Sequence, residues 1–227
     1  MTAFLRKNPF ALRCALSLLI LTGVASCKLW TIRPLESKAK TNTATTPTFS
    51  ADRYVDAIWE SKLVPAVAEK AVDLAALLTA LDANADEAKK QYGVRDGDGP
   101  VHFMVKGEGE VGHTDLDSPH RTVTIRLPKY RGKTEIKMQI GPVFRGTSLR
   151  DAVGFIKFNE FINQLQYAEV ATKLNDRVFS TVIPVLKNLE PASLQGKSLI
   201  FYGVFTLQER DKIMLTPVKL AWGGKGE

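Results

Sequence analysis

The sequence has 227 residues, of which 44% are hydrophobic and 24% are charged, with a formal net charge of +7. This is enough chain to bury a sizeable core in one domain of ordinary size or in two very small ones. Its lysines and arginines are spread along the chain, so they form no cluster dense enough for a nucleic-acid footprint. We therefore expect no nucleic-acid partner.

The first 26 residues predict a signal peptide of the lipoprotein type. Arg6, Lys7 and Arg13 precede an apolar run over 14–25, and small residues then lead to Cys27. The run is too short to span a bilayer, which takes about 20 apolar residues. We expect cleavage before Cys27 and attachment of a lipid to its thiol; the alternative is an uncleaved signal anchor.

Lipidation of Cys27 determines both the charge and the chemistry of the mature chain. Loss of residues 1–26 leaves a net charge of +4, which suits a protein close to anionic lipid headgroups. It also leaves no free thiol, which excludes disulfides, thiolate metal sites and cysteine nucleophiles. We expect the chain at the periplasmic face of the envelope, and Lys28 after the cysteine favours the outer membrane of a two-membrane bacterium.

Residues 27–49 predict a lipidated, flexible tether. After Glu36 the segment is dominated by threonine, alanine and lysine, and it cannot bury enough apolar surface to offset its ordering entropy. The rest of the mature chain, 50–227, is expected to form a single periplasmic domain.

Residues 50–93 predict a helical layer. Apolar residues recur at helical spacing on both sides of Pro65, which predicts a kink or restart. Asn84 and Glu87 have capping-box spacing for a further short helix, and Gly93 is a plausible stop. The apolar stripes suit a core better than a partner groove, because the strands that follow need cover.

Residues 100–222 predict an OB-like barrel. Alternating apolar residues predict strands near 101–105, 123–127, 136–140, 199–207 and 213–220, and Gly107 and Gly109 follow the first of them. Ser148 and Asp151 have capping-box spacing, and helical patterning continues through Phe161 and Leu165 to Leu174. The fold class is thus α+β: a five-stranded OB-like barrel with helices inserted between strands three and four, preceded by the helical layer.

Several motifs are better explained as structure than as chemistry. The segment 107–112 reads GEGEVG, but no helix is predicted at its third glycine and its two glutamates would repel a pyrophosphate. His102, His113 and His120 lack the spacing of a structural zinc site. No nucleophile, zincin or phosphate-loop motif occurs. We therefore predict no metal, no cofactor and no catalytic residue, although a triad assembled from distant residues would leave no motif.

The most distinctive segment is 140–178, where hydrogen-bonding side chains alternate with aromatic rings. Such groups either form a satisfied internal network that fixes the helices on the barrel, which we favour, or converge on a polar ligand. The side chains in question are Arg145, Arg150, Asp151, Asn159, Asn163, Gln164 and Asn175.

At this segment the chain resembles a bacterial family of predicted periplasmic lipoproteins of unknown function. The resemblance covers nearly the whole mature chain and includes DRYVDAIWESKLVP, VKGEGEV, GPVFRGTSLRDAVGFIKFNEFINQLQYAEV and GKSLIFYGVF. It implies an OB-type fold and genes that lie beside sugar ABC transporters of the ribose or xylose kind. It implies no catalytic residues.

Together these observations predict a lipid-anchored accessory or binding protein that is associated with a sugar ABC uptake system. Its partner would be a transporter component or a solute-binding protein, in addition to the membrane reached through Cys27. This association comes from the resemblance alone. The alternatives are an enzyme acting on periplasmic saccharide, which needs paired carboxylates in a pocket, and a purely structural envelope protein.

Overall fold

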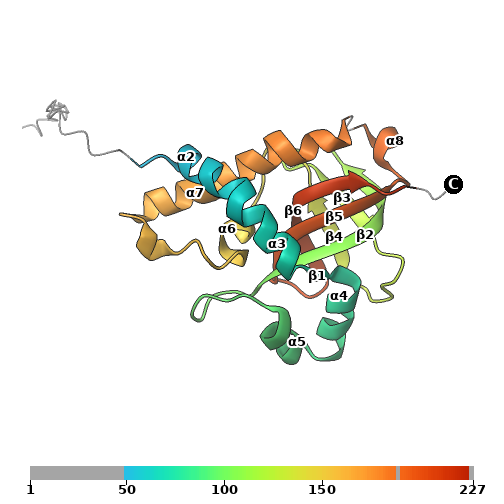
Figure 1. Cartoon of the computed structure of the whole chain (residues 1–227). Coiled ribbons are helices and arrows are strands. Elements are labelled where there is room, and N and C mark those ends of the chain that lie inside the picture. Colours follow the sequence, from blue (N-terminus) through green and yellow to red (C-terminus); the bar gives the residue numbers. More distant parts are fainter. Residues whose placement is uncertain (1–48, 188–189, 225–227) are drawn as a thin grey trace, which may run out of the picture. The chain divides into compact units, whose positions relative to one another are not determined.

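The computed structural model describes residues 49–187 and 190–224 (Figure 1). The predicted signal peptide, Cys27 and almost all of the predicted tether lie outside the described residues. Within them, no helix has the length and apolar character needed to cross a membrane.

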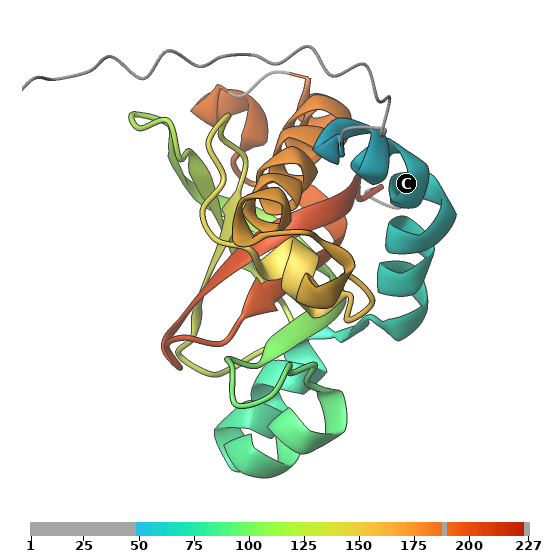
Figure 2. The same ribbon diagram turned by 90° about the vertical axis from the view of Figure 1, so that its left-hand side faces the viewer.

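The N-terminal helices form one continuous rod and then a compact pair. The rod comprises α2 (Ala51–Ile58), a π-helical turn η1 (Trp59–Leu63) and α3 (Val64–Lys70). The π turn directly precedes Pro65, at the place where the sequence predicts a kink. The pair comprises α4 (Leu74–Ala83) and α5 (Ala85–Tyr92), which project below the barrel in Figure 2.

Two sequence signals in this pair act as predicted. The Asn84 side chain accepts a hydrogen bond of 3.2 Å from the backbone N–H of Glu87 and so caps α5. Gly93 is the C-terminal cap of that helix. The apolar stripes of the helices are buried, for example at Leu63, Val67 and Leu74, so they form core rather than a partner groove.

Five strands close into a barrel, and a short β1 (Val72–Asp73) pairs in parallel with its first strand. The barrel strands are β2 (His102–Asp115), β3 (Thr122–Arg126), β4 (Glu135–Gln139), β5 (Ser198–Thr206) and β6 (Lys212–Trp222). Their order is β2-β3-β4-β6-β5, and the pairing of β5 with β2 closes the ring; β4 and β6 are parallel and the other neighbours antiparallel. This confirms the predicted fold class.

The first barrel strand is much longer than predicted. Gly107 and Gly109 do not follow the strand but lie inside β2, which pairs with β5 through 102–110 and with β3 from Glu110 onward. Close approach of neighbouring strands explains the glycine at 109, because a Cβ there would lie 2.5 Å from Cγ2 of Ile125. The GEGEVG segment is therefore strand.

The helices between β4 and β5 are more interrupted than predicted. They are α6 (Ser148–Ala152), η2 (Phe158–Glu160), α7 (Gln164–Arg177), η3 (Val178–Val182), η4 (Ile183–Leu186) and α8 (Pro191–Leu194). Gly154 has a φ of 73°, a left-handed conformation that ends α6 early.

Two details of the helix prediction are wrong. The N-cap position of α6 belongs to Thr147, whose hydroxyl bonds the carboxylate of Asp151 at 2.6 Å, so Ser148 does not form the predicted capping box. The predicted apolar stripe does not hold either: α7 begins only at Gln164, so Phe161 lies outside it, and Leu165 in its first turn is 76% exposed. The remaining apolar side chains join one contiguous core in which Phe103, Phe201 and Phe205 fill the barrel.

Candidate functional site

The alternation of β4 and β6 creates a polar outer face on the barrel. Ile136 and Met138 on β4 are buried in the core, so Lys137, between them, points to the opposite face. On β6 the same alternation turns Lys212 and Met214 outward, and Met214 lies opposite Lys137 in the register. The outer face of these parallel strands therefore carries long polar side chains around one apolar side chain.

A buried glutamine fixes the loop that borders this face. Gln139, 1% exposed, accepts a hydrogen bond of 2.6 Å from the backbone N–H of Arg145 through Oε1. Its Nε2 donates to the carbonyl oxygen of Arg145 at 3.2 Å and to Oγ1 of Thr216 on β6 at 2.9 Å. Because one amide holds both backbone groups of Arg145, the position of this arginine is tied to the strands themselves.

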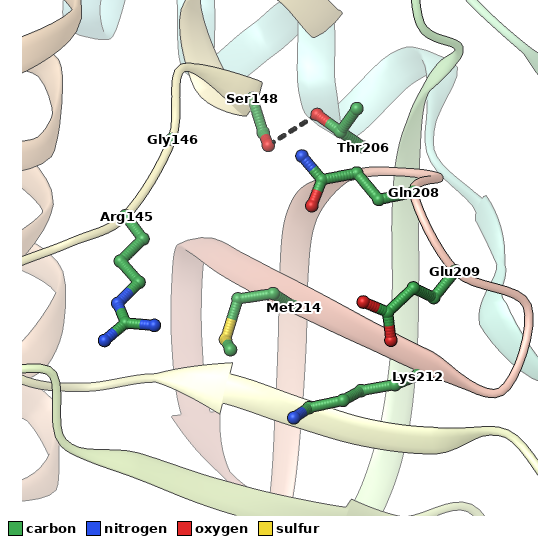
Figure 3. A pocket seen from close by; sticks show the side chains of 8 residues that line it. All are labelled: Arg145, Gly146, Ser148, Thr206, Gln208, Glu209, Lys212 and Met214. Atoms are coloured by element: carbon green, nitrogen blue, oxygen red, sulfur yellow. Dashed lines mark hydrogen bonds between the residues drawn. The ribbon is translucent and has the colours of Figure 1, made fainter.

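Two adjacent hollows lie on this face and share Arg145, Lys212 and Met214; we call them together the polar groove. The first has a volume of about 260 Å³ and the second of about 140 Å³. The first is lined by the residues shown in Figure 3, namely Arg145, Gly146, Ser148, Thr206, Gln208, Glu209, Lys212 and Met214. The second adds Asp115, Ser118, His120, Thr122, Lys137 and Gln139.

The charged side chains of the first hollow have no internal partners. Among the described residues, Arg145, Glu209 and Lys212 form no ion pair and no side-chain hydrogen bond, and the same holds for Gln208. In Figure 3 the Arg145 and Lys212 side chains lie on either side of Met214. The hollow thus offers unpaired donors and an unpaired acceptor around an apolar floor, which suits a ligand rich in hydroxyl groups.

The upper wall of the groove is a short chain of hydrogen bonds that leads into the core. Ser148 Oγ lies 2.7 Å from Thr206 Oγ1, which lies 2.9 Å from Nδ1 of His102. His102 is 5% exposed, and burial lowers the pKa of its imidazole, which favours the neutral form. These hydrogen bonds hold the two hydroxyls in place on the wall of the groove.

Of the seven polar residues singled out in 140–178, the structure brings Arg150 and Asp151 into one network. Arg150 Nε bonds Asp151 Oδ1 at 2.7 Å, Arg150 also donates to the carbonyl of Tyr167 at 3.1 Å, and its guanidinium carbon lies 3.7 Å from the centre of the Tyr167 ring. The Tyr167 hydroxyl donates to Asp151 at 3.3 Å, and burial raises the pKa of that hydroxyl. This network ties α6 to α7.

The other five residues lie apart from this network. Arg145 is exposed in the polar groove, and Asn175 donates to the carbonyl of Gly146 at 3.1 Å, which braces the groove loop. Asn163 caps α7 by accepting from the backbone N–H of Gln166. Asn159 and Gln164 are exposed and make no side-chain hydrogen bond with other described residues.

A hollow larger than either part of the polar groove, about 420 Å³, lies over β2, and its lining includes three carboxylates, those of Asp73, Glu108 and Glu110. Ser198 donates to Glu108 at 2.6 Å, and Arg126 pairs with Glu110 at 2.6 Å. Asp73 accepts a hydrogen bond of 2.9 Å from the backbone N–H of Ala76, so all three of these exposed carboxylates already have partners among the described residues.

The three histidines do not meet. His102 lies at the start of β2, His113 lies near its end, and Nδ1 of His120 donates to the carbonyl oxygen of Val143 at 3.0 Å. Among the described residues no group of three histidine, cysteine, aspartate or glutamate side chains is placed to hold a metal ion.

Sequence reasoning missed most of the groove. Gln139, Gln208, Glu209 and Lys212 are scattered over a strand, a hairpin turn and a second strand, and no spacing relates them. One signal existed, because OB folds bind ligands over their second and third strands and the adjoining loops. Here these are β3, β4 and the loops 116–121 and 207–211, which line the groove.

Comparisons with known proteins agree with this architecture. A family model described as "Predicted periplasmic lipoprotein (DUF2291)" matches residues 17–221. Among solved structures, an OB-fold protein from Thermotoga maritima is similar, with a TM-score of 0.62 and 25% sequence identity over 77% of this chain and 99% of that one. No curated protein matches the sequence.

Proposed function

We propose that this chain, which belongs to the DUF2291 family of predicted periplasmic lipoproteins, is a non-catalytic protein. In this proposal it binds a saccharide in the polar groove. The membrane anchor that the family implies would be attached at Cys27, as its sequence context predicts. The lipid would keep the binding domain close to the membrane.

The observation that carries this proposal is the set of unpaired polar side chains around Met214. A sugar hydroxyl both donates and accepts, so a wall that combines arginine, lysine, glutamine and glutamate can satisfy several hydroxyls at once. Met214 offers an apolar surface to the C–H face of a sugar ring. OB folds use this face for oligosaccharides, which supports the proposal by analogy.

A partner from a sugar ABC uptake system is the physiological context that we propose for this binding. Its support is the position beside such transporters that the family resemblance implies for the gene, together with the fit of the groove to hydroxyl-rich ligands. An enzyme is less well supported, because the carboxylates of the hollow over β2 already have partners.

Calorimetric titration of the purified lipoprotein in detergent tests the groove. Ribose, xylose and a xylan-derived tetrasaccharide serve as ligands, and we expect at least one of them to bind. Arg145→Ala/Lys212→Ala should weaken that binding at least tenfold, which corresponds to loss of about 1.4 kcal/mol. Lys62→Ala/Lys70→Ala, which removes the same charge from exposed positions in η1 and α3, should bind like the wild type. Equal affinity in both double variants would show that the ligand lies elsewhere.

A further inference from the structure

A cluster of apolar side chains is exposed where α7 begins. Phe158 is 51% exposed, Ile162 88% and Leu165 76%, the last two being the most exposed large apolar side chains among the described residues. We call these three residues the apolar knuckle. Single exposed apolar residues are ordinary, but three within eight positions of the chain form a patch of the kind that marks an interaction surface.

The knuckle is held rigidly rather than left loose. The side-chain oxygen of Gln166 accepts from the backbone N–H of Ile162 at 3.1 Å, while Asn163 accepts from the backbone N–H of Gln166 at 2.9 Å. This reciprocal capping fixes the backbone on both sides of the helix start. An apolar residue just before the N-cap usually packs on the first turn of its helix, whereas Ile162 points into solvent.

An aromatic cluster joins the knuckle to the point where the tether enters the domain. The ring of Phe49, the first described residue, packs edge-on against Phe161 at 5.5 Å between centroids. Phe161 also contacts Tyr54 and Tyr167, and Tyr167 contacts Phe158. In Figure 1 the loop before α7 accordingly lies beside the start of α2. The chain therefore leaves the domain towards Cys27 from the same corner that exposes the knuckle.

We propose that the apolar knuckle contacts the lipid surface to which Cys27 anchors the chain, so that this corner of the domain rests on the membrane. The inference depends on the proposed lipid anchor but not on the groove ligand. Cys27 lies 22 residues before Phe49, and a chain of that length spans at most about 75 Å. The anchor thus limits the distance between the domain and the bilayer, and it acts on the domain at this corner, where exposed apolar side chains at a helix end are placed to insert into the interface.

The apolar and charged groups at this corner favour a lipid surface over other binding partners of the knuckle. The three knuckle side chains are apolar, which suits the acyl boundary, and the one carboxylate between them in the chain, Glu160, is engaged by the hydroxyl of Tyr54 at 3.3 Å. The mature chain has a net charge of +4, which favours approach to anionic headgroups. The start of α7, a helix of 14 residues, adds the positive end of its dipole on the same side.

Site-specific fluorescence on the full lipoprotein tests the contact. Lipidation of Cys27 leaves the mature chain without a free thiol, so Ile162→Cys gives a single position for a nitrobenzofurazan label. Gln195→Cys is the matched control: it is exposed at the end of α8, which lies at the opposite side of the domain in Figure 1. Both proteins are placed in vesicles of phosphatidylethanolamine and phosphatidylglycerol.

We expect the emission of the label at 162 to shift to shorter wavelength in vesicles and to be quenched by brominated lipid, while the label at 195 does neither. Co-flotation with vesicles but unchanged emission at 162 would overturn the contact alone. Failure to float with vesicles would overturn the anchor and the contact together. A shift that grows with the ratio of protein to lipid would assign the knuckle to a second copy of the chain instead. Saccharide binding is measured in a separate experiment, so a negative result for the groove would leave the membrane contact unaffected, and the reverse also holds.

Discussion

Replacing Arg150 with alanine should destabilise the domain, because this guanidinium is the centre of the link between α6 and α7. Its side chain is 11% exposed, and that of its partner Asp151 is 20% exposed. Loss of one member of a buried ion pair costs about 3–5 kcal/mol. Asp151 keeps the hydrogen bonds from Thr147 and Tyr167 and some contact with water, which lowers the cost to about 2–3 kcal/mol.

Loss of the stacking over the Tyr167 ring adds about 0.5–1 kcal/mol. The total of about 3 kcal/mol corresponds to a fall in melting temperature of roughly 6–12 °C for a domain of this size. Guanidinium unfolding followed by tryptophan fluorescence measures the change, since Trp59 is buried at 3% exposure in the described core.

Arg145→Ala is the control, because this exposed side chain makes no contact that stabilises the described fold; its stability should stay within about 0.5 kcal/mol of the wild type. Arg150→Lys should lie between the two, since an ammonium cannot both stack on the ring and reproduce the fork of hydrogen bonds. An unaltered Arg150→Ala variant, or equal losses for Arg145→Ala and Arg150→Ala, would refute the assignment of Arg150 to the internal network.

Three other variants test separate parts of the structure. Gln139→Leu should lower the free energy of unfolding by about 2–4 kcal/mol in denaturant titrations, because three hydrogen bonds are lost, and should weaken saccharide binding because Arg145 is no longer fixed. Since burial lowers the pKa of His102, the unfolded chain binds more protons than the folded one below about pH 6.5. Wild type should therefore lose more stability between pH 7 and pH 5 than His102→Gln, and equal pH slopes would contradict this. Cys27→Ala should stay unprocessed and take up no radioactive palmitate, whereas normal labelling would place the lipid elsewhere.

The barrel was predictable because each strand is marked by a pattern within its own short stretch of sequence. Period-two alternation marks each strand, and the order of three strands, helices and two strands matches one known way to close a five-stranded barrel. The length of β2 was not predictable in this way, since Gly107 and Gly109 usually weaken a strand. Only the approach of Ile125 and the ring of Phe201 explains why glycine is needed inside it.

The polar groove was hidden from sequence for a different reason. Alternation along β4 places Gln139 on the outer face, where a polar side chain would ordinarily be solvated, yet the loop 140–147 covers it and makes it the support of Arg145. Likewise the spacing of Phe161 and Leu165 suits a helix stripe, but the left-handed Gly154 stops α6 and delays the next long helix to Gln164. In both cases the conformation of a loop determined how exposed the side chain is, and the spacing of apolar residues in the sequence does not encode loop conformation.

A continuous set of contacts joins the groove to the corner where the tether enters. Thr147, in the groove loop, bonds Asp151; Asp151 pairs with Arg150; Arg150 lies over Tyr167; and Tyr167 packs on Phe161, which contacts Phe49. These contacts restrict the rotamers of the side chains that make them. The groove and the knuckle are therefore supported by one connected network within the domain. Gln139 also holds the backbone of Arg145 in place in the free protein. A saccharide would therefore not have to order this loop on binding. Such preorganisation lowers the entropic cost of binding and so favours affinity in a hollow of modest volume.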